Sequence, residues 1–264
     1  MTVHRLDTTT GLLPSRAITS APSFSLLNWY AWTPGRETRA AWCEWAGCDP
    51  SVDDAVPPQV LPMMMRRRLS SFGQRLVSAL TMCAEGRPEA RFVLSTRHGE
   101  LSRALNILKD IEASTLPSPT DFSMAIHHAL LGLLSIHTDN RMGHTALSSG
   151  WDSFASGMLE AVMCVTERPD QPVVFVYADE PLPTEYDAFR ERDDESLPLI
   201  VALTIGRPTG APGEDFSLQL VPHSTGQAPS SAMATDFLRF FLSKASTVHG
   251  VGRHSDWVWR RVSS

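Results

Sequence analysis

The sequence predicts an α/β fold in which a layered mixed sheet carries helices on both faces. Helical and strand-like segments alternate from about residue 90 onward. The run from Pro172 to Ala178 is continuously apolar, as expected for a strand that is covered on both faces. A chain of 264 residues with 42% hydrophobic residues can bury a sizeable core, in one large domain or two small ones.

The N-terminal third begins with a segment, residues 1–22, that is rich in Thr, Ser and Pro and has no clear period. We expect it to be loosely ordered. The aromatic and apolar run Ser25 to Trp32 predicts a strand that stops at Pro34 and Gly35. The Asp and Pro content of Cys48 to Pro58 predicts a loop.

Two helices and a strand follow. Arg66, Arg67 and Arg68 lead into a helical pattern through Leu76 and Cys83, and Arg91 to Thr96 is predicted to be a strand. An amphipathic helix is expected after Gly99. Its apolar residues recur at three- and four-residue spacing: Leu101, Leu105, Leu108 and Ile111.

A further helix is predicted between Ser118 and Ile136, capped by Thr120 or Asp121. Gly132 interrupts its apolar stripe. Glycine costs about 1 kcal/mol relative to alanine inside a helix, so its presence suggests close backbone packing there.

The C-terminal half starts with the run His144 to Gly150, which precedes an apolar helical stretch from Phe154 to Val165. The tail Trp257 to Arg261 is too short to classify. The remaining predicted elements are an acidic loop at 183–196, strands at 198–206 and 216–220 separated by loops, and a helix at 235–243.

Composition excludes several classes of function. A net charge of −6 and a pI near 5.8 argue against nucleic acid as a partner. No apolar window is long enough to cross a bilayer, and the first residues lack the pattern of a signal peptide, so we expect a cytoplasmic protein. The four cysteines have neither zinc-ligand nor disulfide spacing. We therefore expect free thiols, and neither a metal nor a cofactor.

Three motifs resemble the β-ketoacyl synthases. Thr-Ala-Leu-Ser-Ser-Gly resembles the nucleophile elbow Thr-Ala-Cys-Ser-Ser-Gly of that family, with Leu147 at the cysteine position. The run Ser118 to Ala129 also resembles that family. The run Val173 to Pro183, which ends in Asp-Glu-Pro-Leu-Pro, is similar to shortened ketosynthase-like proteins. The elbow residues are Thr145, Ala146, Leu147, Ser148, Ser149 and Gly150.

This resemblance covers about residues 23–205 and implies a truncated thiolase-like fold, the N-terminal half of a condensing enzyme. Residues 23–264 would then form a single domain with a C-terminal helical extension. A leucine cannot form a thioester, and the His-Gly-Thr-Gly-Thr-like run of the family's second half is missing. His223, His249 and His254 are interpreted as ordinary surface histidines. The resemblance therefore implies a non-catalytic subunit, similar to the chain-length factors paired with ketosynthases in aryl-polyene pathways.

The resemblance also implies partners, because condensing enzymes are dimers whose elements near the elbow meet across a two-fold axis. We expect a heterodimer with an active ketosynthase, and contact with an acyl carrier protein through that complex. The candidate contact residues, besides the turn from Thr145 to Ser149, are Phe122, Ile126, His127 and Leu131. The alternative for Phe122, Ile126 and Leu131 is burial in the chain's own core.

Two other functions remain open from sequence. A weak acyl hydrolase could use Ser148 or Ser149, although Gly-x-Ser-x-Gly is absent. Its candidate bases are His144 and His137, and its candidate orienting carboxylates are Asp152 and Asp139. A free-standing module could instead bind an acyl carrier protein or an acyl chain, with Arg66, Arg67 and Arg68 as the carrier or phosphate contact. The alternative for these arginines is a solvated helix start with one of them paired to a carboxylate.

Overall fold

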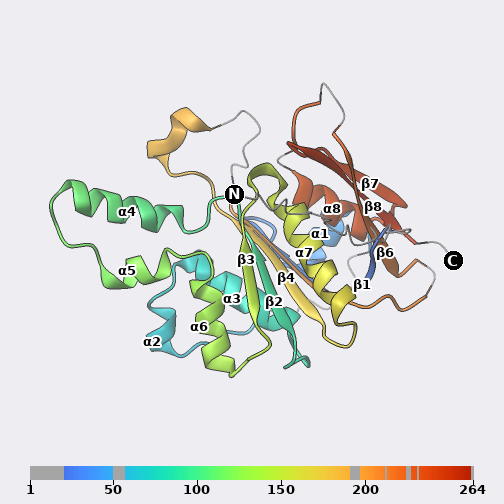
Figure 1. Cartoon of the computed structure of the whole chain (residues 1–264), viewed down its shortest axis with the longest axis horizontal. Coiled ribbons are helices and arrows are strands. Elements are labelled where there is room, and N and C mark those ends of the chain that lie inside the picture. The colour runs from blue at the N-terminus through green and yellow to red at the C-terminus, as the bar shows by residue number, and fades with distance from the viewer. Residues whose placement is uncertain are drawn as a thin grey trace, which may run out of the picture.

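A mixed β-sheet forms the centre of the molecule in a computed structural model that describes residues 21–49, 57–190, 197–211, 213–223, 227–230 and 232–262. Within these residues the sheet has eight strands in the order β3-β2-β4-β5-β1-β6-β8-β7 (Figure 1). The strands are β1 (Ser23–Trp32), β2 (Arg91–Ser95), β3 (His144–Leu147), β4 (Val173–Asp179), β5 (Leu199–Gly206), β6 (Asp215–Pro222), β7 (Thr247–Gly250) and β8 (Ser255–Arg261).

Helices cover both faces of this sheet, as the sequence predicts (Figure 1). They are α1 (Arg39–Ala46), α2 (Met63–Arg66), α3 (Ser71–Cys83), α4 (Leu101–Glu112), α5 (Pro119–Met124), α6 (Ala129–Thr138), α7 (Ser153–Glu167) and α8 (Met233–Leu242). Two short 3-10 helices, η1 (Gly150–Asp152) and η2 (Thr184–Phe189), follow β3 and β4.

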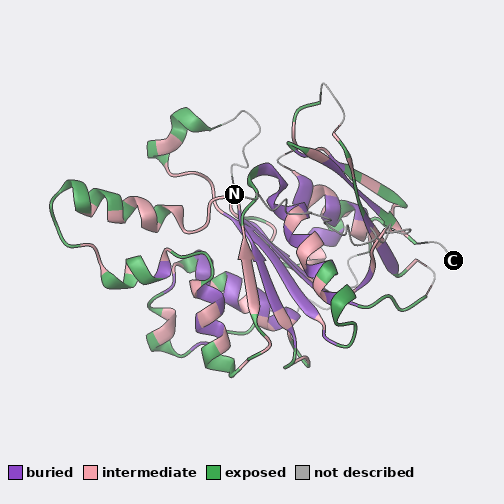
Figure 2. Cartoon of the chain, viewed as in Figure 1, coloured by how far each residue is buried: buried purple, intermediate pink, exposed green. Residues whose placement is uncertain are grey.

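Strand β2 pairs in parallel with β3 and β4, and the remaining strand pairs are antiparallel. Every residue of β4 and β5 is buried (Figure 2). Their continuous apolar sequences are those of strands covered on both faces, which confirms the prediction for residues 172–178.

Two apolar clusters hold the layers together. One contains residues of α3 and α6 with Phe92, Val174 and Ile200 of the sheet. The other contains residues of α1, α7 and α8 with Phe175 and Trp259. Because successive side chains of a strand point to opposite faces, neighbouring residues of β4 supply the two clusters in turn.

The helix expected between Ser118 and Ile136 is broken into α5 and α6. Ser118, rather than Thr120 or Asp121, caps the first piece, because its Oγ accepts a hydrogen bond from the backbone N–H of Asp121 at 3.3 Å. The close packing expected at Gly132 is wrong, since a Cβ there would meet open space. It occurs instead at Gly157 of α7.

The C-terminal extension contains more than the predicted strand at 216–220 and the predicted helix. Besides α8 it contributes β6, β7 and β8 to the sheet, and the unclassified tail Trp257 to Arg261 belongs to β8. In the acidic loop, residues 184–189 form η2, while 191–196 lie outside the described residues. The same holds for residues 1–20 of the N-terminal segment.

Across the described ranges, no helix combines the length and apolarity that a bilayer crossing needs. The same residues contain no group of three or more metal-ligating side chains, and Cys43, Cys48, Cys83 and Cys164 are free thiols.

Candidate functional site

The elbow motif forms a tight turn between β3 and α7. Leu147 is the last residue of β3, and its carbonyl accepts a hydrogen bond from the N–H of Thr96 at 3.2 Å. Gly150 then adopts a φ of 56°, in the left-handed region that favours glycine, and opens η1. Leu147 is partly buried and packs against the core cluster on the α7 face. A side chain at position 147 therefore lies at the strand-to-helix turn.

Internal hydrogen bonds occupy the polar groups of this turn. The Oγ of Ser148 donates to the carbonyl of Arg97 at 2.9 Å. The N–H of Ser149 donates to the Oγ of Ser153 at 2.9 Å, and that Oγ donates to the carbonyl of Gly150 at 2.8 Å. The N–H of Ser149, a group of the kind that stabilises an oxyanion in acyl transfer, is thus engaged within the turn.

Asp179, the last residue of β4, holds the loop after β2 beside the elbow. One carboxylate oxygen, Oδ1, accepts hydrogen bonds from Thr96 Oγ1 at 3.1 Å, Arg97 N at 3.2 Å and His98 N at 3.1 Å. Burial raises the pKa of this carboxyl, while the charge of His98 and the hydrogen bonds oppose the rise. Its position indicates a role in positioning the loop.

A very small cavity lies next to the elbow. Its lining includes Arg97, His98, Gly150, Trp151 and Asp179, and its volume is about 20 Å³. The guanidinium of Arg97 lies over the ring of Trp151, 3.8 Å from its centre. A space of this size holds a single water molecule, so an acyl chain does not fit there.

Acidic groups cluster near the cavity at the base of α4. Glu180 has a pKa raised to about 7, first by burial and then by the charges of Glu100 and Asp179, with Arg103 acting in the opposite direction. Arg103 pairs with Glu100 at 3.0 Å and with Asp121 of α5 at 2.6 Å. This guanidinium therefore joins α4 to α5.

The residues proposed for an acyl hydrolase are not brought together. His144 begins β3, three residues before Leu147, which corresponds to about 10 Å of strand. His137 lies in the last turn of α6, on the opposite face of the sheet from α7. Asp152 accepts a hydrogen bond from the N–H of Arg253 at 3.1 Å, and Asp139 forms an exposed ion pair with Arg141. No triad geometry supports this alternative.

The predicted partner-contact residues divide into two groups. Phe122 is 67% exposed, Ile126 is 47% exposed, and His127 is also exposed. Leu131 is fully buried in the apolar cluster that contains residues of α3 and α6. Its assignment to a partner contact is therefore wrong, and the alternative, burial in the chain's own core, is correct for this residue.

Sequence reasoning missed the exposed apolar face of α4. The helix contains no buried residue (Figure 2). Its side chains Leu108 and Ile111 are 54% and 59% exposed. Helix α4 projects away from the sheet with α5 beside it (Figure 1). The apolar periodicity of α4 is present in the sequence. Because such a stripe normally faces a core, the sequence alone did not predict that it would be exposed.

The three arginines have different surroundings. Arg67 and Arg68 are exposed, whereas Arg66 is half-buried and donates from Nη1 to Gln59 Oε1. The carbonyl of Arg68 accepts a hydrogen bond from Arg103 Nη2 at 2.8 Å. Within the described part of the chain, no ion pair joins these arginines to a carboxylate, so the carboxylate pairing considered as an alternative is not found.

The chain thus has a mixed sheet between two helical layers and a strand-to-helix turn after β3. The family model of the β-ketoacyl synthase N-terminal domain matches residues 42–260. The chain therefore belongs to the β-ketoacyl synthase N-terminal domain family. The match starts later than the resemblance at residues 23–205 and extends into β8.

Solved structures show the same fold. One is a chain of the ketosynthase ApeO in complex with its chain length factor ApeC from Xenorhabdus doucetiae, which is 26% identical with a TM-score of 0.77. That similarity covers 90% of this chain and 99% of the other. A chain of the ishigamide ketosynthase/chain length factor is 12% identical, with a TM-score of 0.64 and coverage of 92% and 100%. No curated protein matches the sequence.

Proposed function

We propose that this chain is a non-catalytic, chain-length-factor-like subunit that pairs with an active β-ketoacyl synthase in polyene, polyketide or fatty-acid-like biosynthesis. It would stabilise that synthase and help to shape its acyl tunnel. The observation that carries the proposal is Leu147 at the strand-to-helix turn of a ketosynthase-family fold. The side chain there has no nucleophilic atom, no proton donor and no acceptor.

The state of the elbow supports a non-catalytic role. A nucleophile at such a turn needs open space for the acyl group and free N–H groups for the oxyanion. Here the neighbouring cavity holds about 20 Å³, and the N–H of Ser149 is bonded to Ser153. We infer that the turn serves as structure rather than as a reaction centre.

The edge of the sheet supports pairing with a second protein. Strand β3 is the terminal strand of the described sheet and has β2 as its one neighbour. An edge strand offers a row of unpaired backbone donors and acceptors to another chain. The elbow continues this strand, so a partner paired along β3 would also contact the turn.

The exposed apolar side chains of α4 and α5 also support contact with a partner. Leu108, Ile111 and Phe122 are all more than half exposed on α4 and α5. Exposed apolar side chains that gather on neighbouring elements mark sites of protein association. Together with β3, these two helices define the surface that we propose for the ketosynthase, and Arg67 and Arg68 remain available for an acyl carrier protein.

Co-expression with a β-ketoacyl synthase of the same organism tests the proposal. We expect one heterodimeric species in size-exclusion chromatography, with condensation activity that needs both chains. A monomer that never co-elutes with the synthase would refute the pairing. Carrier binding by the chain alone would favour a free-standing carrier-binding module, and a covalent acyl adduct in intact-mass measurement after incubation with an acyl thioester would favour an enzyme.

A further inference from the structure

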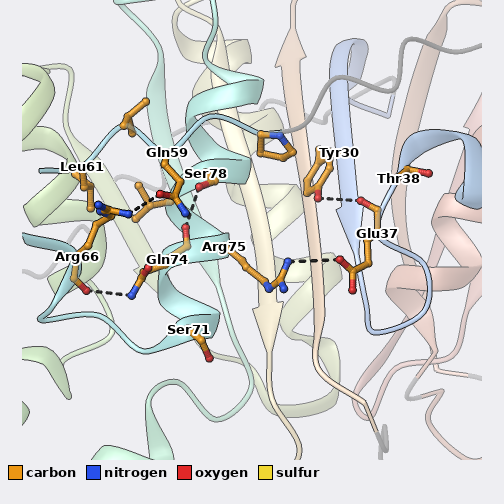
Figure 3. Close-up of a pocket in the computed structure, with 13 residues that line it drawn as sticks. Tyr30, Glu37, Thr38, Gln59, Leu61, Arg66, Ser71, Gln74, Arg75 and Ser78 are labelled. Atoms are coloured by element: carbon orange, nitrogen blue, oxygen red, sulfur yellow. Dashed lines mark hydrogen bonds and ion pairs between the residues drawn. The ribbon is translucent and has the colours of Figure 1, made fainter. Parts of the chain in front are cut away.

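A second, larger cavity lies beside α3 (Figure 3). Its lining residue Tyr30 belongs to β1, which three strands separate from β3 in the sheet. We call it the α3 pocket. It has a volume of about 470 Å³, within the range of small-molecule sites. Four segments form it: one face of α3, the loop from Pro57 to Leu61, the end of α2 with Arg66, and the region of β1 and the start of α1 that contains Tyr30, Glu37 and Thr38.

The charges of the α3 pocket differ from those of the whole chain. Its lining contains two guanidinium groups, from Arg66 and Arg75, and one carboxylate, from Glu37. The chain as a whole has a net charge of −6. A net positive lining in an acidic protein favours an anionic ligand.

The two guanidinium groups are not equivalent. Arg75 pairs with Glu37 at 3.7 Å and lies over the ring of Trp32, 4.5 Å from its centre. Arg66 makes its side-chain hydrogen bond to the neutral amide of Gln59, and its Nε is buried without a hydrogen-bond partner in the described structure. Figure 3 shows these two pairs on separate sides of the pocket. Arg66 therefore carries the charge that an oxyanion would neutralise.

Uncharged polar groups lie between the two arginines. Ser71, Gln74 and Ser78 recur at three- and four-residue spacing on α3, so they share one face of the helix, and all three line the pocket. Val60, Leu61 and Val77 add apolar surface. Such a lining suits a chain with hydrogen-bonding groups and short apolar segments better than a purely aliphatic chain.

We propose that the α3 pocket binds a linear small molecule with an oxyanion at one end, held by Arg66, and an uncharged hydrogen-bonding chain along the polar face of α3. A phosphate ester on an amide-containing chain has this chemistry. The pocket is separate from the elbow, because Tyr30 and Val77 belong to the core cluster on the α3 face, whereas Leu147 packs on the α7 face.

Calorimetric titration of the purified chain tests the site with three probes. We expect saturable one-to-one binding of 4′-phosphopantetheine. Pantetheine, which lacks the oxyanion, should bind about ten-fold more weakly or worse, and so should inorganic phosphate, which lacks the chain. Equal affinity for pantetheine or for inorganic phosphate, or no saturable binding of 4′-phosphopantetheine, would overturn the proposal.

Matched variants separate the pocket from general charge effects. Arg66→Gln should weaken binding of 4′-phosphopantetheine about ten-fold or more, whereas Arg141→Gln, the same change on an exposed arginine outside the pocket lining, should leave it within about two-fold. Ser71→Glu places a carboxylate in the pocket at the first position of α3, where acidic residues favour the helix, so it should weaken binding without loss of thermal stability. Equal effects of the two arginine changes, or full binding by Ser71→Glu, would contradict the site.

The test does not depend on the ketosynthase. Binding of 4′-phosphopantetheine can persist if the chain fails to pair with a synthase, and pairing can persist if the α3 pocket is empty. A failure to bind 4′-phosphopantetheine therefore does not refute the pairing, and a failure to pair does not refute the α3 pocket.

Discussion

Gly157 of α7 lies directly against Ser95 of β2. A Cβ built on Gly157 would come within 2.5 Å of the Cβ of Ser95 and within 2.6 Å of the ring of Phe175, closer than real Cβ atoms approach other groups. This contact sets the distance between α7 and the sheet. Because α7 follows the elbow directly, the absence of a side chain at position 157 also sets where the turn at Leu147 lies.

Gly157→Ala should therefore destabilise the protein, by about 1–3 kcal/mol, because the added methyl group must displace Ser95 or Phe175. Gly132→Ala is the matched control in another helix. Its Cβ would enter open space, so the substitution should stabilise the fold by about 0.5–1 kcal/mol. Denaturant unfolding measures both changes, and equal midpoints for the two variants would contradict the packing of α7.

Local sequence patterns predicted most of the fold. Apolar runs located β4, β5 and α7, and the mixed sheet with helices on both faces was expected. The contrast between Gly132 and Gly157 was not predictable, because the sequence around each residue is an apolar helix. What distinguishes them is the tertiary neighbour. Strands β7 and β8 were missed for the same reason, since β8 is stabilised by pairing with β6 across a long separation in sequence.

For the candidate site, too, residues that are contiguous in sequence could be predicted, whereas residues that only the fold brings together could not. The elbow was found because its residues are contiguous, from Thr145 to Gly150. The cluster of Glu180, Glu100 and Arg103 was missed, because only folding brings the end of β4 to the start of α4. Leu131 was assigned to a partner surface because periodicity identifies an apolar face without identifying what covers it.

The pH dependence of stability should report on Glu180. Its folded pKa of about 7 lies above the ordinary value of 4.5, so the folded state holds a proton that the unfolded state releases between these values. The stability contribution of this group therefore falls as the pH rises from about 4.5 to about 7, and stays low above that. Glu180→Gln removes the effect. Because the carboxyl is only partly buried, screening limits the expected gain to about 1 kcal/mol at pH 8, with no gain at pH 4.

Thermal unfolding of the two proteins across this pH range measures the difference. The raised pKa of Asp179 is present in both proteins, so its contribution largely cancels in the comparison. A constant difference between pH 4 and pH 8 would show that Glu180 titrates normally in the fold.

Arg103 should control the attachment of α4 and α5 to the rest of the domain. Its side chain is 14% exposed and binds Glu100, Asp121 and the carbonyl of Arg68. Arg103→Met leaves two carboxylates without their partner, so we expect a local cost of about 1.5–3 kcal/mol. Hydrogen exchange measures this as faster exchange in α4 and α5, with β4 and β5 unchanged.

The control for Arg103 is Arg141→Met. Arg141 forms an ion pair with Asp139 at 3.0 Å, but the two side chains are 84% and 80% exposed. Exposed ion pairs contribute little to stability. The free energy of local opening that hydrogen exchange measures should therefore remain within about 0.5 kcal/mol of that of the unchanged protein. If both variants loosen α4 equally, the network around Arg103 has no special role.

Substitutions on the exposed apolar face should separate association from stability. Ile111→Ser and Phe122→Ser remove apolar surface that is already 59% and 67% exposed, so the melting temperature should change little. Each should reduce co-purification with the ketosynthase about ten-fold or more, if the apolar side chain is buried in the complex. Leu220→Ser on β6, at 52% exposure, is the control and should leave pairing intact. Equal pairing by all three variants would place the partner elsewhere.

Replacement of Leu147 by cysteine should not create a condensing enzyme. The turn would gain a thiol at the start of a helical segment, a position that favours a thiolate. However, Leu147 packs against the core, the cavity lined by Gly150 and Trp151 of the turn holds about 20 Å³, and the N–H of Ser149 is already bonded to Ser153. We expect Leu147→Cys to show no acyl adduct by intact mass after incubation with an acyl thioester, and no condensation beyond background. Leu147→Ala, which opens similar space without a thiol, is the control. Acylation of the cysteine variant alone would show that the elbow retains a working oxyanion site, and the non-catalytic assignment would then rest on the missing sulfur atom alone.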